Sequence, residues 1–161
     1  MARTPEIEGV KDTIKALRRI DPELRKEFNA KYKDAVSPMT NAAKAIYDDQ
    51  RFPSGTKRTW APGGRKIFPL TAAKAKTGVR PKINTSYRGG TALYVMQANP
   101  AAAVFDIAGR STGLGSAFSA KFGRDPSRVM WPVAERHEKQ VKKNVEELVK
   151  ETTKTVQKLV D

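Results

Sequence analysis

The sequence predicts an α+β fold, in which an N-terminal helical pair and a long C-terminal helix pack a small antiparallel β-meander, with two long mobile loops. Apolar residues recur every three to four positions at both ends of the chain and every second position in part of its middle. The length of 161 residues suits one domain. We therefore expect a single domain, 1–161, made of five segments: helical 1–50, a basic loop 51–80, the meander 81–108, a glycine-rich loop 109–125 and the C-terminal helix 126–161.

The first 50 residues predict two helices with one shared apolar face. The first stripe has spacings of four, three and three residues: Val10, Ile14, Leu17 and Ile20. Asp21 then suits an N-cap and Pro22 the first position of a new helix, whose apolar stripe continues through 24–46. Because proline disfavours helix at the residue before it, Pro38 should kink this helix or end it near Ser37.

Residues 51–80 mix proline, glycine and cations without a hydrophobic period, which is typical of a long loop. Residues 51–130 hold 14 basic and two acidic side chains, whereas 1–50 hold ten and nine, and 131–161 hold seven and six. Most of the formal net charge of +14 therefore lies in the middle of the chain. Such clustering predicts contact with nucleic acid or with an acidic protein face, the alternative being charge that only keeps the protein soluble. The candidate contact residues are Arg51, Lys57, Arg58, Arg65, Lys66, Lys74, Lys76 and Arg80.

Alternation of polar and apolar residues predicts a strand at 82–87, followed by a hairpin turn at 88–90 that contains two glycines. Residues 91–98 are β-prone and mostly apolar, which predicts a second, central strand. Asn99 and Pro100 form a further turn, and the apolar run 102–108 supplies a third strand of the meander. Each strand reverses direction at its turn, so we expect an antiparallel sheet.

Glycine and serine in 109–125 predict a second mobile loop before the last helix. Pro132 suits the first turn of that helix, which would be about 43 Å long if it continued to Val160. Its apolar residues fall close to a heptad seam: Val141, Val145, Leu148, Thr152, Val156 and Leu159. Lysine and glutamate occupy the other faces, as in an exposed amphipathic helix.

The residues needed for catalysis are scarce. The chain has no cysteine and one histidine, His137, and only Asp106 and Asp125 are acidic within 51–130. We expect Asp106, in its strand, to pair with a cation such as Arg110, and Asp125 to occupy a turn. Glycine spacings do not fit a phosphate-binding loop, and apolar runs are far shorter than the ~20 residues of a membrane span. We therefore expect no enzyme activity, cofactor, metal or membrane contact.

Aromatic residues lie among the cations of the middle region, as in proteins that stack bases while neutralising phosphates: Phe52, Trp60, Phe68 and Tyr87. No named nucleic-acid motif is present, so such binding would be independent of sequence. Trp60 and Trp131 are more simply interpreted as core or interface anchors.

The order of segments resembles the neck and tail-completion proteins of long-tailed bacteriophages. The resemblance lies in 10–28, which leads into the alanine-rich 39–46, and in the strand motif Leu93-Tyr94-Val95. It also includes 128–135, where a proline stands at the start of the long C-terminal helix. The basic segment 51–80 and the glycine-rich segment 109–123 depart from the family pattern.

The resemblance implies a structural virion protein at the head–tail junction, assembled in the host cytoplasm. Such proteins form homo-oligomeric rings, commonly hexameric, that stack on neighbouring neck and tail-tube rings around the DNA channel. They terminate or complete the tail and join it to the head connector. The basic segment would then face genomic DNA or an acidic surface of an adjacent ring. A small basic protein that binds nucleic acid without sequence preference is the alternative.

Replacing Lys57, Arg58, Arg65 and Lys66 together by glutamine separates these two functions. We expect the variant to keep its circular dichroism spectrum and to lose ring assembly or infectivity, because the cations face a ring neighbour or the channel. A variant that assembles normally but no longer binds duplex DNA would support the nucleic-acid alternative, since each lost phosphate contact lowers the salt dependence of binding.

Overall fold

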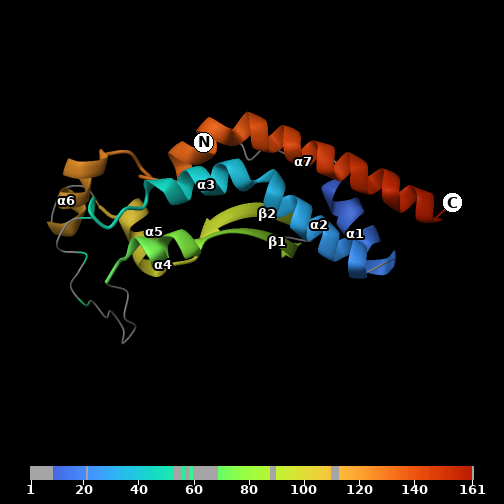
Figure 1. Cartoon of the computed structure of the whole chain (residues 1–161), viewed down its shortest axis with the longest axis horizontal. Helices are drawn as coiled ribbons and strands as arrows, with labels where there is room; N and C mark the ends of the chain where they lie inside the picture. Colours follow the sequence, from blue (N-terminus) through green and yellow to red (C-terminus); the bar gives the residue numbers. More distant parts are fainter. Residues whose placement is uncertain are drawn as a thin grey trace. The chain divides into compact units, whose positions relative to one another are not determined.

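The computed structural model describes residues 9–20, 22–52, 56, 59, 69–87, 90–109 and 113–160. Over these residues, seven helices accompany a two-stranded antiparallel sheet (Figure 1), which confirms the α+β class, the N-terminal helix pair and the long C-terminal helix. The chain divides into two compact units, so the single-domain interpretation stays a prediction. The first unit comprises Met1–Pro38, Pro81–Tyr94 and His137–Asp161, and the second Met39–Arg80 and Val95–Arg136.

Three helices build most of the first unit: α1 (Val10–Ile20), α2 (Pro22–Ala35) and the part of α7 (Met130–Val160) that follows Arg136. Figure 1 shows α2 beside this part of α7, and the Asn144 Nδ2 atom donates a hydrogen bond of 3.0 Å to the Ala35 carbonyl. The helices bury one apolar side each: Ile14, Leu17, Phe28, Tyr32, Val145, Leu148, Val149 and Val156.

The apolar seam predicted for α7 is buried over most of its length. Val145, Leu148 and Val156 are buried, and Val141 and Thr152 are half-buried, whereas Leu159 is 57% exposed. The seam therefore packs within the first unit as far as Val156 and is open to solvent in the last turn.

The break predicted near Pro38 is confirmed. Helix α2 ends at Ala35, and α3 (Ser37–Ile46) begins with Pro38 in its first turn, where the missing backbone N–H costs no helical hydrogen bond.

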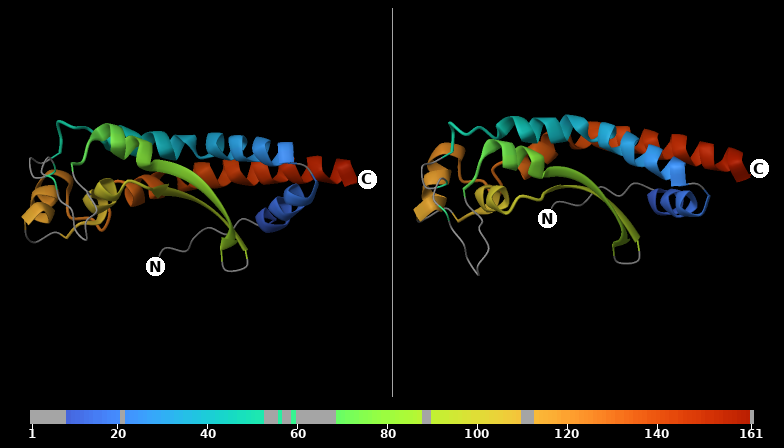
Figure 2. Two further views of the ribbon diagram at one scale, coloured as in Figure 1. Left: turned by 90° about the horizontal axis from the view of Figure 1, so that it is seen from below. Right: turned by 60° about the horizontal axis from the view of Figure 1, so that its bottom comes forward.

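Strands β1 (Val79–Tyr87) and β2 (Gly90–Gln97) form the predicted hairpin, and Figure 2 shows them side by side up to their turn. The predicted third strand at 102–108 is wrong, because this run forms helix α5 (Pro100–Ile107). The Asn99 side chain caps the helix by accepting a 2.9 Å hydrogen bond from the Ala102 N–H, and Pro100 occupies its first turn. Periodicity alone does not separate a short apolar strand from a buried helix.

The two predicted loops also contain helices. Within 51–80, α4 (Ala72–Gly78) follows Thr71, whose hydroxyl caps it by accepting from the Lys74 N–H. Within 109–125, α6 (Gly113–Phe122) forms despite its glycines. Tertiary packing of its aromatic residues outweighs the low helix propensity of glycine.

The core of the second unit is organised around Phe105, which is fully buried in α5. Four aromatic rings have their centroids 4.8 to 6.2 Å from the Phe105 ring: Tyr47, Phe52, Phe118 and Phe122. Three of these pairs are edge-to-face, the arrangement that aligns the positive edge of one ring with the negative face of another. Phe52, which the sequence suggested for base stacking, is therefore a core residue.

A polar network beside this core depends on Gly78. The Gln97 Nε2 atom donates to the Tyr47 hydroxyl and to the Ala75 carbonyl, both at 3.0 Å, and its Oε1 atom accepts from the Asn99 N–H at 2.9 Å. Burial raises the pKa of Tyr47 to about 12, so this phenol stays a neutral partner for Gln97. A Cβ atom on residue 78 would lie 1.8 Å from the Gln97 Oε1 atom and 2.9 Å from the Asn99 backbone nitrogen.

We expect Gly78→Ala to lower the free energy of unfolding by about 1–3 kcal/mol, because the backbone of Asn99 cannot move aside as a flexible side chain would. Urea denaturation measures the change. Gly109→Ala is the matched control, since a Cβ there meets no atom within 4 Å and should leave stability unchanged or raise it by less than ~1 kcal/mol. Equal stability of the two variants would contradict this interpretation of Gly78.

Candidate functional site

Only half of the predicted basic contact residues lie in the described part of the chain. Arg51, Lys74, Lys76 and Arg80 are all exposed. The others, together with Trp60, lie outside the described residues: Lys57, Arg58, Arg65 and Lys66.

The four described cations do not converge on one point. Lys74 and Lys76 are two residues apart on α4, so they face different sides of the helix. The Arg80 Nε atom donates to the Thr77 carbonyl at 2.9 Å, and the Arg51 guanidinium lies 5.1 Å from the centroid of the Phe122 ring. These side chains present positive charge in several directions rather than lining a single site.

Asp106 is the best-defined polar centre of the second unit, and it lies in helix α5 rather than in the predicted strand. Its carboxylate accepts hydrogen bonds from the N–H groups of Arg128, Val129 and Met130 at 2.9, 2.6 and 3.3 Å. The Ser127 hydroxyl also donates to it and accepts from the Trp131 N–H. The carboxylate therefore caps the first turn of α7, where unpaired N–H groups favour a negative charge.

Arg128, just before α7, in turn donates hydrogen bonds to the end of α5. Its guanidinium donates to the carbonyls of Phe105 at 2.8 Å and Ala108 at 3.2 Å, at the C-terminal end of α5. It also donates to the Ser119 hydroxyl at 3.3 Å and lies 5.4 Å from the centroid of the Phe118 ring, both in α6. Cations are favoured at a helix C-terminus, so the reciprocal cap, formed by Asp106, Ser127 and Arg128, joins the ends of α5, α6 and α7.

Two large apolar side chains next to the reciprocal cap are exposed. Ile107 follows Asp106 and is 65% exposed, and Trp131 is 48% exposed. The Trp131 indole Nε1 atom donates to the Glu135 carboxylate at 2.7 Å, one turn further along α7. The predicted role of Trp131 as an interface anchor stays a prediction, and the structure adds that its ring is held by a partner on its own helix.

The hydrogen bonds of Asp106 give this carboxylate a structural role as a helix cap. The Asp106 carboxylate is buried and occupied by four donors, so no substrate proton can reach it. Within the described ranges, no three histidine, aspartate or glutamate side chains lie close enough to hold a metal ion. None of the described helices combines the length and apolar character that crossing a membrane requires.

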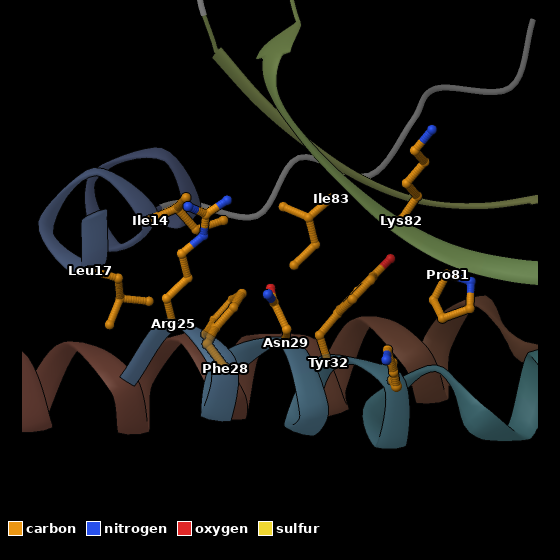
Figure 3. Close-up of a pocket in the computed structure, with 10 residues that line it drawn as sticks. Ile14, Leu17, Arg25, Phe28, Asn29, Tyr32, Pro81, Lys82 and Ile83 are labelled. Carbon is orange, nitrogen blue, oxygen red and sulfur yellow. The ribbon is translucent and has the colours of Figure 1, made fainter. Parts of the chain in front are cut away.

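A groove lies between α1, α2 and β1 in the first unit, and the sequence analysis did not single it out (Figure 3). Its volume is about 240 Å³. The buried side chains at its floor are Ile14, Leu17, Phe28 and Tyr32. Arg25 and Lys33, both exposed, line its mouth, whereas the side chain of Lys82 points away from α2.

Comparison of the chain with protein families, with curated proteins and with solved structures found no match.

We expect Asp106→Ala to lower the free energy of unfolding by at least about 3 kcal/mol, because it leaves several buried donors without an acceptor. Asp106→Asn keeps an acceptor oxygen of similar shape and should lose about half as much. Urea denaturation measures both variants. If alanine and asparagine cost the same, or if neither costs more than ~0.5 kcal/mol, the carboxylate is not the cap that the geometry indicates.

Proposed function

We propose that the chain is a structural virion protein of the head–tail junction of a long-tailed bacteriophage. In this function copies of the chain close into a ring around the DNA channel, complete the tail and join it to the head connector. The protein acts by assembly, without a catalytic step, and contacts the rings above and below.

The observation that carries the proposal is the exposure of Trp131 and Ile107 beside the reciprocal cap. Tryptophan is enriched among residues that dominate binding energy at interfaces, and a ring already held in one orientation loses little freedom on binding. The bond from Trp131 to Glu135 supplies that orientation. A surface with these properties suits a permanent contact between subunits.

The segment order that resembles the phage family also supports the proposal. The N-terminal helix pair, the hairpin containing Leu93-Tyr94-Val95 and the long helix with Pro132 in its first turn all have counterparts in the described structure.

Nucleic-acid binding without sequence preference is the second candidate, favoured by the exposed cations Arg51, Lys74, Lys76 and Arg80. Two observations make it the weaker one. Phe52 is buried in the aromatic core and unavailable to stack on a base, and the two α4 cations face different sides of their helix.

The test is the mass of the purified protein by light scattering at about 0.15 M and 0.5 M salt, with negative-stain images of the same fractions. We expect a closed ring at both salt concentrations. Trp131→Ala should raise the concentration at which the ring dissociates about 30-fold, equivalent to about 2 kcal/mol per contact. Glu138→Ala, an exposed change on the same helix, is the control and should leave the ring intact.

A monomer at both salt concentrations that binds duplex DNA only at the lower one would overturn the ring proposal in favour of nucleic-acid binding. If Trp131→Ala forms rings as stable as those of the unchanged protein, Trp131 is not part of the subunit contact.

A further inference from the structure

The groove between α1, α2 and β1 has an uncompensated positive mouth. Arg25 and Lys33 lie eight residues apart on one face of α2, with Asn29 between them. Figure 3 shows Arg25 and Asn29 beside the groove, and Lys82 on β1 with its side chain directed away from α2. Neither Arg25 nor Lys33 forms an ion pair with a residue that the structure describes, and no carboxylate of the described residues lines the groove. The mouth therefore attracts a negatively charged group.

Two of the three carboxylates of α2 pair with other cations of the helix. Glu23 pairs with Lys26 at 2.6 Å and Glu27 with Lys31 at 3.0 Å, both on the exposed surface of the helix. Helix α2 thus carries two cations that are neutralised by its own glutamates and two, Arg25 and Lys33, that form no ion pair within the described part of the chain.

The floor of the groove is apolar, and its size limits what it can hold. Phe28 and Tyr32 contribute their rings from α2, and in Figure 3 Ile83 points toward them from β1. Sites for drug-sized small molecules usually measure about 300–1,000 Å³. A volume of about 240 Å³ suits one or two apolar side chains better than a cofactor.

We propose that this groove docks an acidic segment of another protein, which inserts one or two apolar side chains between α2 and β1 and sets its carboxylates against Arg25 and Lys33. The apolar anchor supplies most of the affinity, and the two cations supply orientation and rate of association. The interaction is independent of the ring proposed above, because it uses neither Trp131 nor Ile107.

The probe is a panel of fluorescein-labelled peptides of about ten residues, in which aspartate and glutamate flank two apolar residues placed one to four positions apart. Fluorescence anisotropy measures their binding to the full chain. We expect at least one member to bind, and its version with serine at both apolar positions to bind at least about tenfold more weakly.

The double variant Arg25→Gln/Lys33→Gln should weaken binding at least about fivefold, because it removes both cations at the mouth. Lys26→Gln/Lys31→Gln is the matched control, since it makes the same change of net charge on the same helix outside the groove, and should change binding less than twofold. Circular dichroism establishes that both variants are folded.

The proposal is overturned if no panel member binds, if the serine peptides bind equally well, or if the two double variants weaken binding alike. It is also overturned if Arg25→Gln/Lys33→Gln affects duplex DNA binding or self-association more than peptide binding. Since ring closure is read from mass and groove binding from anisotropy, either proposal can fail without the other.

Discussion

The ends of two helices supply each other's missing hydrogen-bond partners, and the second unit is built around that exchange. A helix leaves about four N–H groups unpaired at its start and four carbonyls at its end, and each costs roughly 1–3 kcal/mol if buried without a partner. The Asp106 carboxylate receives the N–H groups of α7, while Arg128 donates to carbonyls of α5. Since Phe105 precedes Asp106, adjacent residues set both the aromatic core and the start of α7.

Segments with a long, clear period were predictable from the sequence. The stripes of α1, α2 and α7 extend over three or more turns, and the alternation in β1 has a glycine-containing turn beside it. The sequence predicts a strand in place of α5 because a short, mostly apolar segment carries no distinguishing period, although Asn99 and Pro100 are a good helix start. Helix α6 was unpredictable locally, because contacts of Phe118 and Phe122 with Phe105 stabilise it.

For the candidate sites, too, features within one short segment were predictable from the sequence, and contacts between distant segments were not. Composition located the positive charge in 51–130, but it could not show that Lys74 and Lys76 diverge, because that requires the bounds of α4. The groove combines residues 14–33 with 81–83, which no local pattern joins, although basic residues eight apart beside an aromatic stripe were a visible signal on α2. The capping role of Asp106 was likewise hidden, since its donors lie more than twenty residues away.

The residues of the reciprocal cap are synthesised in a fixed order. A chain leaves the ribosome from its N-terminus, so Asp106 emerges more than twenty residues before the donors at 127–130 that complete its hydrogen bonds. Until then its buried position would hold an unsatisfied charge, which disfavours early closure of the aromatic core around Phe105. When Arg128 is synthesised, its backbone N–H can donate to the Asp106 carboxylate and its guanidinium to carbonyls at the end of α5. Helix α7 is synthesised after the aromatic residues of this core, and its first turn therefore allows the core to consolidate.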